Sequence, residues 1–331
     1  MIGINYAYNK GRGECSQLLF TKSEKVLAFI GVCGIIEMYN NLNAIGEDMK
    51  ITKIAKIESG SQDGAIWSGY LFRMGSRGRV RVYDMARLSG EVRAIAEFYL
   101  DRHDELAPHS NAVMFGNEYY AEGDEFPLLY SNIYNNLKNE ENKEVGVTCV
   151  YRLTREGEVF STELVQLIEV DFTAEAGLWR SEKGVEDVRP YGNFVIDREK
   201  SLIWGFVMRD GDKNTRYFSW RLPTLAEGEP DKKYGVRRAT LKKDDIIEYF
   251  DTPYHFFIQG ATFDSGKVYS TEGFGAKIHP ALRIIDTNEK KEVFHVDLYP
   301  LGLVGEAEFI DIYEGVCYYG DAEGHIYRFD F

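Results

Sequence analysis

Short apolar stretches recur along this chain, and a polar side chain begins each one. Each stretch runs through a tight polar turn into a second apolar segment and then a third. Aligned without gaps, the first and fifth copies also match at Lys25–Val26 and Lys267–Val268. A unit repeated in this way cannot bury its faces alone, so its copies must stack against one another. The six heading residues are Gln17, Asp63, Asn111, Asn193, Gln259 and Glu308.

The segments after each heading residue are expected to be the other strands of a four-stranded unit. Val80 and Val82 alternate with arginines, which is the period of a strand with one face outward. Glu118–Tyr120 is the expected second strand of the third unit. Ile51–Ile57 and Val236–Leu241 are the expected fourth strands of the first and fourth units.

These repeats predict an all-β fold, a six-bladed β-propeller that forms a single domain over residues 1–331. The sixth unit has no fourth strand before Phe331. Ile4–Tyr8 is therefore expected to pair with the C-terminal blade, which would close the ring and hide its edges. The expected blades span residues 16–57, 63–99, 109–172, 191–248, 255–298 and 305–331, the last completed by 4–9.

Three insertions lengthen the middle units, at residues 131–146, 173–189 and 241–252. In the third, Asp244 and Asp245 precede an apolar run and predict a helical turn. Polar insertions are usually solvated loops, but on repeat proteins they often decorate a binding face. The loops are therefore the second place, after the heading residues, to expect a ligand.

Charge and composition exclude some partners. The net charge of −14 repels phosphate backbones, and no basic stripe opposes it, so nucleic acid is not an expected partner. No apolar run is long enough for a membrane-spanning helix. The start lacks a signal-peptide pattern, so we expect a cytoplasmic protein, or a periplasmic one if a precursor segment has been removed.

The 4 cysteines lie far apart and form no Cys-x-x-Cys pair, so neither a structural zinc site nor a redox pair is expected. Cys149 and Cys317 fall in apolar strand patterns, where a free thiol acts as a small buried hydrophobe.

In its repeat form the whole chain resembles six-bladed β-propellers of the bacterial TolB-like type. That resemblance implies a scaffold that works through protein contacts. The segment Ser61–Trp67 is similar to a sialidase Asp-box, but its spacing departs from that motif and it occurs once. We interpret it as an ordinary strand entry.

The first strand of each blade of a propeller lines the central channel. The heading residues would therefore bring carboxamides and carboxylates toward one axis, where each polar group needs a partner. One interpretation is a water-filled channel held by a belt of hydrogen bonds. The other is a ligand or ion site at the same level.

Calcium is the alternative cofactor, because carboxylate and amide oxygens form the all-oxygen set that it prefers. The arrangement is similar to the central site of gluconolactonase and paraoxonase propellers. That similarity implies Asp63, Asn111, Asn193 and Glu308 as ligands, and hydrolysis of a lactone or ester. Otherwise no cofactor is expected.

Three further residues lie close to the heading residues in sequence. His109 and His255 precede Asn111 and Gln259 and are candidate acid–base groups at the channel mouth. Glu306 precedes Glu308 by two residues, so the two carboxyl groups are a candidate pair of raised pKa.

No complete catalytic signature is present. The leading hypothesis is a non-enzymatic propeller whose channel mouth recognises a small polar molecule, a carbohydrate or a protein partner. The alternative is a hydrolase or lyase, calcium-dependent or not, that uses the ring. Candidate aromatic platforms for a sugar ring or a peptide are Trp67, Tyr120, Phe126 and Phe274.

Overall fold

The computed structural model describes residues 49–331 except 60, 134–143, 145, 172–187, 190–192, 210, 256 and 276, and two strands before them. The chain divides into two compact units, residues 1–47 and 48–331, where the sequence predicted one domain. In the first unit, β1 (Ile4–Tyr8) pairs with β2 (Cys15–Leu19) as an antiparallel hairpin. All other described elements belong to the second unit.

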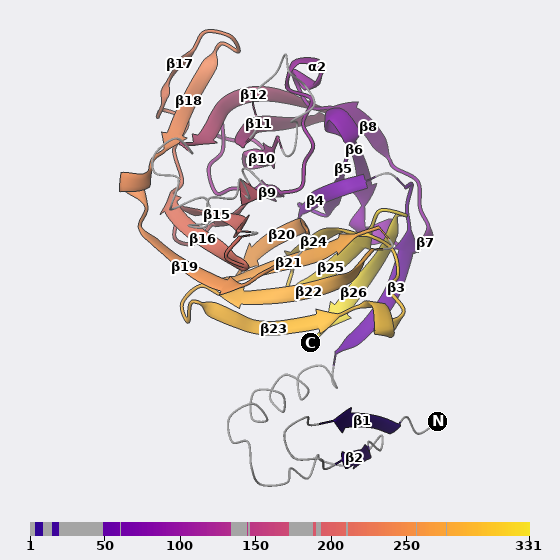
Figure 1. Ribbon diagram of the computed structural model, residues 1–331. Coiled ribbons are helices and arrows are strands. Elements are labelled where there is room, and N and C mark those ends of the chain that lie inside the picture. Colours follow the sequence, from indigo (N-terminus) through magenta and orange to yellow (C-terminus); the bar gives the residue numbers. More distant parts are fainter. Residues whose placement is uncertain are drawn as a thin grey trace. The chain divides into compact units, whose positions relative to one another are not determined.

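The second unit is a β-propeller, and its described residues form five blades rather than the six that we predicted (Figure 1). The first strands of the blades contact one another in a closed cycle around the centre. Blade 1 is β4 (Ser61–Trp67), β5 (Tyr70–Gly75), β6 (Arg79–Asp84) and β8 (Ala96–Tyr99). Blade 2 is β9 (Val113–Phe115), β10 (Leu129–Asn132), β11 (Val147–Glu156) and β12 (Val159–Val170).

The other three blades follow the same antiparallel order from the centre outward. Blade 3 is β14 (Phe194–Asp197), β15 (Leu202–Arg209), β16 (Asn214–Arg221) and β19 (Glu248–Pro253). Blade 4 is β20 (Ile258–Asp264), β21 (Lys267–Phe274), β22 (Ile278–Asp286) and β23 (Lys291–Asp297). Blade 5 is β24 (Ala307–Tyr313), β25 (Val316–Asp321), β26 (His325–Asp330) and β3 (Lys50–Lys56).

Alternation of side chains builds the core between blades. On β6, Val80 and Val82 are fully buried while the arginines beside them stay partly exposed, as the sequence predicted. Blades 1 and 2 meet through aromatic rings: Phe72 makes T-shaped contacts with Phe115 and Phe126, with centroids 5.6 and 5.7 Å apart. Such pairs add roughly 0.5–1.5 kcal/mol each beyond the burial of their area.

The last blade is completed by β3, and the prediction that Ile4–Tyr8 completes it is wrong. β26 pairs antiparallel with β3, and the register sets Ala55 beside Ile326, both buried. This pairing satisfies the edge of the C-terminal blade. Most of Ile51–Ile57, which we expected to be the fourth strand of the first blade, therefore lies in the fourth strand of the fifth blade. Its buried Ala55 packs beside the buried Ile326 of β26.

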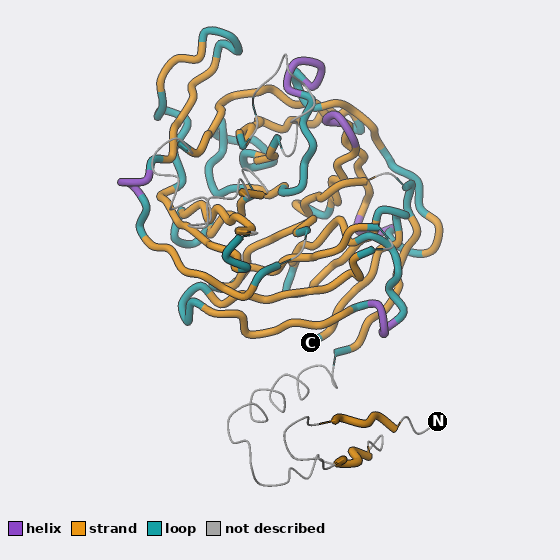
Figure 2. The backbone as a smooth tube through the Cα atoms, in the orientation of Figure 1, coloured by secondary structure: helices purple, strands orange, loops and turns teal. Residues whose placement is uncertain are grey.

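Two other strand assignments are wrong. The second strand of blade 2 is β10, and Glu118–Tyr120 is not a strand. The fourth strand of blade 3 is β19, while β18 (Val236–Leu241) pairs in parallel with β12 of blade 2. With β17 (Glu229–Asp231) it forms a hairpin that extends blade 2 (Figure 2).

Short elements connect the strands. β7 (Gly90–Glu91) pairs in parallel with β3, and β13 (Val188–Arg189) pairs with β15. The helical turn predicted near Asp244 is confirmed as the 3-10 turn η3 (Lys243–Asp245). The remaining turns are η1 (Ser76–Gly78), η2 (Met85–Arg87), α2 (His103–Leu106) and η4 (Tyr299–Leu301).

Most of the expected insertions at 131–146 and 173–189 lie outside the described residues. Cys149 and Cys317 are buried free thiols, as predicted. Among the helices of the described ranges, none has the length and apolar character needed to cross a membrane.

Candidate functional site

Five of the six heading residues stand where the first strands begin, and their side chains are almost fully buried. Their exposed fractions range from 0% for Asp63 to 9% for Gln259. The sixth, Gln17, lies on β2 in the other unit, and its side chain is not described. The central ring consists of Asp63, Asn111, Asn193, Gln259 and Glu308.

The centre at this level is packed with side chains. Asn111 Nδ2 donates to Gln259 Oε1 at 3.0 Å, which joins blade 2 directly to blade 4. Gly260 allows the first strands of blades 1, 4 and 5 to lie close together, because a Cβ there would lie 2.9 Å from the Glu308 carbonyl and 3.0 Å from Asp63 Oδ1. The side chains of Asn111 and Gln259 are thus buried in contact with one another at the centre.

Hydrogen bonds between neighbouring first strands form a belt. Asp63 Oδ2 accepts from the Val113 N–H of blade 2 at 3.0 Å. Asp311 Oδ2 accepts from the Ile66 N–H of blade 1 at 2.7 Å, and its Oδ1 accepts from the Thr262 hydroxyl of blade 4 at 2.8 Å. Each carboxylate therefore satisfies a backbone donor of the next blade and holds the ring together.

The belt leaves several buried polar atoms without a partner among the described residues. They are Asp63 Oδ1, Asn111 Oδ1 and Asn193 Nδ2. Asn193 Oδ1, in contrast, accepts from Asn132 Nδ2 at 2.8 Å. A buried polar group left unsatisfied costs about 1–3 kcal/mol. Both acceptors and a donor are therefore available at the ring.

Arg73 is the member of this region that the sequence analysis missed. It lies on β5, its side chain is 1% exposed, and none of its three guanidinium nitrogens has a hydrogen-bond partner among the described residues. Its guanidinium carbon sits 4.7 Å from the centroid of the Phe309 ring. The one available signal was an arginine inside an otherwise apolar segment, Tyr70–Gly75.

Burial changes the acid–base properties of the ring. Burial first, and then the charge of the nearby Glu306 carboxylate, raise the pKa of Glu308 to about 8. Burial also raises the pKa of Asp63 well above its usual value and lowers the pKa of Arg73 to about 10. The direction for Glu308 is the one expected for a carboxyl group beside Glu306, although burial is the larger cause. Glu306 itself accepts from Gln259 Nε2 at 2.9 Å.

The two predicted histidines differ in position. His109 is exposed, two residues before Asn111. His255 is fully buried and does not join the ring: its nitrogens face the Tyr217 hydroxyl and the Thr252 hydroxyl, each at 3.3 Å, and Glu292 at 3.6 Å. Because burial dominates, the pKa of His255 falls to about 4. Its expected place at the channel mouth is wrong.

The four expected calcium ligands do not form a calcium site. Asp63 Oδ2 and Asn193 Oδ1 already accept hydrogen bonds, and the cationic Arg73 interacts electrostatically with Asp63 and Glu308. Calcium needs 6–8 oxygen ligands and is repelled by a neighbouring guanidinium. These residues therefore do not fit the metal.

A separate cluster of two carboxylates and a histidine lies at the turn between β25 and β26. Asp321, Glu323 and His325 offer ligand atoms within 4.8 Å of one another. Both Asp321 oxygens already pair with His325, one with its backbone N–H and one with Nδ1, each at 2.8 Å. Nothing in this cluster is left to indicate a ligand.

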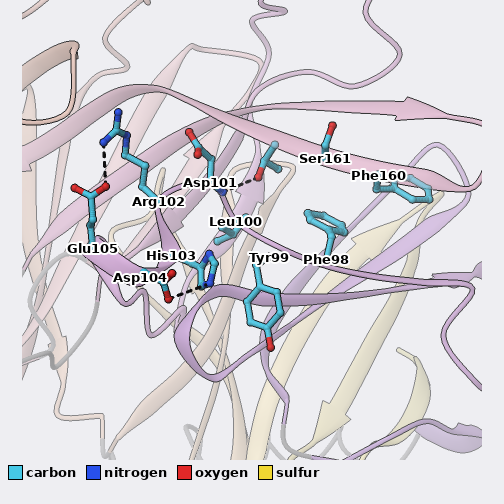
Figure 3. A pocket seen from close by; sticks show the side chains of 11 residues that line it. Phe98, Tyr99, Leu100, Asp101, Arg102, His103, Asp104, Glu105, Phe160 and Ser161 are labelled. Carbon is cyan, nitrogen blue, oxygen red and sulfur yellow. Dashed lines mark hydrogen bonds and ion pairs between the residues drawn. The ribbon is translucent and has the colours of Figure 1, made fainter.

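A pocket of about 560 Å³ lies on the outer strands β8 and β12 beside α2 (Figure 3). Its polar groups already have partners: His103 Nε2 lies 3.2 Å from Asp104, the Asp101 carboxylate accepts from the Leu164 N–H, and the Thr162 hydroxyl accepts from the Asp101 N–H. Among the described residues, none of the buried polar atoms without a partner belongs to the lining of this pocket.

The four predicted aromatic platforms differ in how far they are exposed. Phe126 is buried in the core and Trp67 is half-buried, while Tyr120 and Phe274 are 44% and 46% exposed. The Phe274 ring stacks on Phe257 with centroids 5.0 Å apart, next to the Gly273 carbonyl that accepts from Gln259. Phe274 is thus an exposed aromatic residue near the ring.

Comparisons with known proteins give a fold likeness only. No protein-family model matches the chain, and no curated protein matches it. Among solved structures, it is similar to Myxococcus xanthus glutaminyl cyclase, at 11% identity and TM-score 0.42, covering 84% of this chain and 98% of that one. It is also similar to a proposed oxidoreductase (glucose dehydrogenase) from Thermus thermophilus, at 12% identity and TM-score 0.42, with coverage of 85% and 100%.

A third structure, BamB from Moraxella catarrhalis, matches at 5% identity and TM-score 0.30, covering 81% of this chain and 69% of that one. At such identities a structural likeness carries no information about activity.

Proposed function

We propose that this protein is a non-enzymatic binding propeller that recognises a small polar molecule at the end of the propeller where the first strands begin. The observation that carries the proposal is that buried atoms of Asp63, Asn111 and Asn193 have no hydrogen-bond partner in the part of the chain that the structure describes. A molecule with both donors and acceptors would satisfy these groups together, whereas an apolar ligand would not.

The exposed ring of Phe274 favours a ligand that has a flat apolar face as well as hydroxyl groups. Phe274 is 46% exposed beside the strand that carries Gln259. Exposed aromatic rings stack well on sugar-like faces while polar groups beyond them read hydroxyls. A carbohydrate is therefore the preferred class of polar ligand.

A thermal-shift screen of monosaccharides, amino acids and nucleosides tests the proposal. A ligand at about 100 times its dissociation constant adds roughly 2.7 kcal/mol to stability, which raises the melting temperature by several degrees. Asn193→Leu should weaken binding of any hit, because it removes the free Nδ2 donor. Asn288→Leu, on the turn between β22 and β23, is the matched control. A hit that binds Asn193→Leu unchanged would contradict the proposed site.

One observation favours the alternative of a hydrolase or lyase. The pKa of Glu308 is raised to about 8, which suits a general acid near neutral pH. The reaction would use the Glu306 and Glu308 carboxyl groups without calcium, because Arg73 opposes a cation there. Turnover of a screened ester or lactone that is lost in Glu308→Gln would establish this alternative in place of binding alone.

A further inference from the structure

Arg73 carries a positive charge in a place where no described group neutralises it by contact. Its side chain is 1% exposed, its three guanidinium nitrogens lack hydrogen-bond partners, and no carboxylate lies within 4.0 Å of them among the described residues. A buried ion without pairing or hydrogen bonds costs several kcal/mol even after relaxation. A group that presents acceptor oxygens to this guanidinium would offset that cost.

The fold holds Arg73 in one orientation. Gly64 lies opposite Arg73 across β4 and β5, and a Cβ on Gly64 would lie 3.2 Å from Arg73 Cδ. Because Gly64 has no side chain, there is room beside it for the Arg73 side chain. Phe309 of β24 supports the guanidinium from blade 5 at 4.7 Å. A planar, pre-oriented fork of donors of this kind matches the two oxygens of an oxyanion.

The surrounding carboxyl groups do not supply that partner. Asp321 is engaged by His325 through both of its oxygens. Asp63 Oδ2 accepts from the Val113 N–H, and Asp63 Oδ1 has no hydrogen-bond partner among the residues that the structure describes. The carboxyl groups of Asp63 and Glu308 have the largest electrostatic effects on Arg73, but neither forms a hydrogen bond with its guanidinium in the described part of the chain.

We infer that the ligand of the ring carries an oxyanionic group, a carboxylate or a phosphate-like group, which the Arg73 guanidinium binds through paired N–H donors. This inference rests on the proposed function and narrows it to acidic ligands such as sugar acids. Burial favours the protonated forms of Asp63 and Glu308, so these groups would donate hydrogen bonds to the anion. Asn193 Nδ2, which has no partner within the described ranges, is a further donor for the rest of the ligand.

The test uses the full chain and small probes: sodium formate, acetate, phosphate and sulfate, each compared with chloride at equal ionic strength. At least one probe should raise the melting temperature saturably by a few degrees. Arg73→Lys should weaken that probe by about tenfold or more, because lysine lacks the planar fork. Arg328→Lys, on β26, is the control and should leave binding unchanged. Formate and acetate acting alone identify a carboxylate, and phosphate and sulfate acting alone identify a phosphate-like group.

Crystals of the wild-type protein soaked in bromoacetate or selenate provide a second measurement if Arg73→Lys does not fold. Anomalous density within hydrogen-bonding distance of the Arg73 guanidinium supports the inference. Water density there, with no anion stabilising the protein beyond chloride, overturns it. An uncharged ligand that needs Asn193 but binds Arg73→Lys unchanged also overturns it, and leaves the proposed polar site standing.

Discussion

The side-chain amide of Asn111 donates to Gln259 Oε1 at 3.0 Å, although the two residues belong to blades 2 and 4, which are not neighbours in the ring. This bond crosses the centre of the propeller. It shows that the ring is narrow enough for side chains from opposite sides to meet, and it couples blades whose β-sheets share no edge.

A double-mutant cycle should detect this bond. Asn111→Ala and Gln259→Ala should each lower the free energy of unfolding, because each leaves a buried polar partner unsatisfied. Their coupling energy should be about 0.5–3 kcal/mol, measured by urea denaturation. Asn111→Ala combined with Asn288→Ala should be additive. A coupling near zero between Asn111 and Gln259 would mean that the bond is not formed in solution.

Gly260→Ala should destabilise the propeller by about 1–3 kcal/mol, because the new Cβ would lie 2.9 Å from the Glu308 carbonyl and 3.0 Å from Asp63 Oδ1. Gly157→Ala separates crowding from backbone strain: its φ is +64° and nothing lies near its Cβ, so about 1 kcal/mol is expected. Equal losses in the two variants, measured by denaturation, would argue against a crowded centre.

Glu308 should make the propeller less stable as the pH rises. Its folded pKa is about 8, above its ordinary value of 4.5, so the folded state binds the proton more tightly than the unfolded state does. Its contribution is fully present below about pH 4.5 and is lost as the pH rises through 8. Glu308→Gln should remove at least about 1 kcal/mol of this dependence between pH 5 and pH 8. The exposed Glu91→Gln is the control, and an unchanged pH profile in Glu308→Gln would count against a buried, protonated carboxyl.

His255 should act in the opposite direction. Its folded pKa is about 4, below its ordinary 6.5, so the unfolded state binds the proton more tightly. The stability that it contributes is present above about pH 6.5 and is lost as the pH falls toward 4. His255→Asn should flatten the loss on acidification, measured by thermal melts between pH 4 and pH 7. His279→Asn, on the surface, is the comparison, and parallel curves for wild type and His255→Asn would disprove the assignment.

Deletion variants should separate the hairpin unit from the propeller. Removing residues 1–47 leaves β3 in place, and the propeller should melt as it does in the full chain. Removing residues 1–57 also removes β3, which exposes the edge of β26 and should lower the melting temperature by several degrees and promote aggregation. Similar melting of the two deletions would contradict the pairing of β3 with β26.

The ring was predictable because its signal is local. A polar residue at the entry of an apolar strand is visible in sequence, and five such residues, from Asp63 to Glu308, are buried where the first strands begin. The blade count was not predictable in the same way. Lys50–Lys56 carries a strand pattern, but its partner lies at the other end of the chain, and no local property of the segment states that.

Arg73 and His255 show the limit for side chains. The position of Arg73 depends on a glycine across the hairpin and on Phe309 from another blade, and the burial of His255 depends on strands β16, β19 and β23. Both environments arise only when separate blades pack together. A sequence pattern shows that an arginine interrupts an apolar strand, but it does not show which residues of other strands surround the guanidinium.

In sequence, the β17–β18 hairpin lies between β16 and β19 of blade 3, but it pairs with the outer strand of blade 2. In the same way, β7 lies between β6 and β8 of blade 1, but it pairs with β3 of blade 5. The blades are thus not interchangeable modules. An engineer who excised residues 194–253 as one repeat would also strip the neighbouring sheet of its outermost strands, so chimaeras of this protein must exchange blades 2 and 3 as one piece.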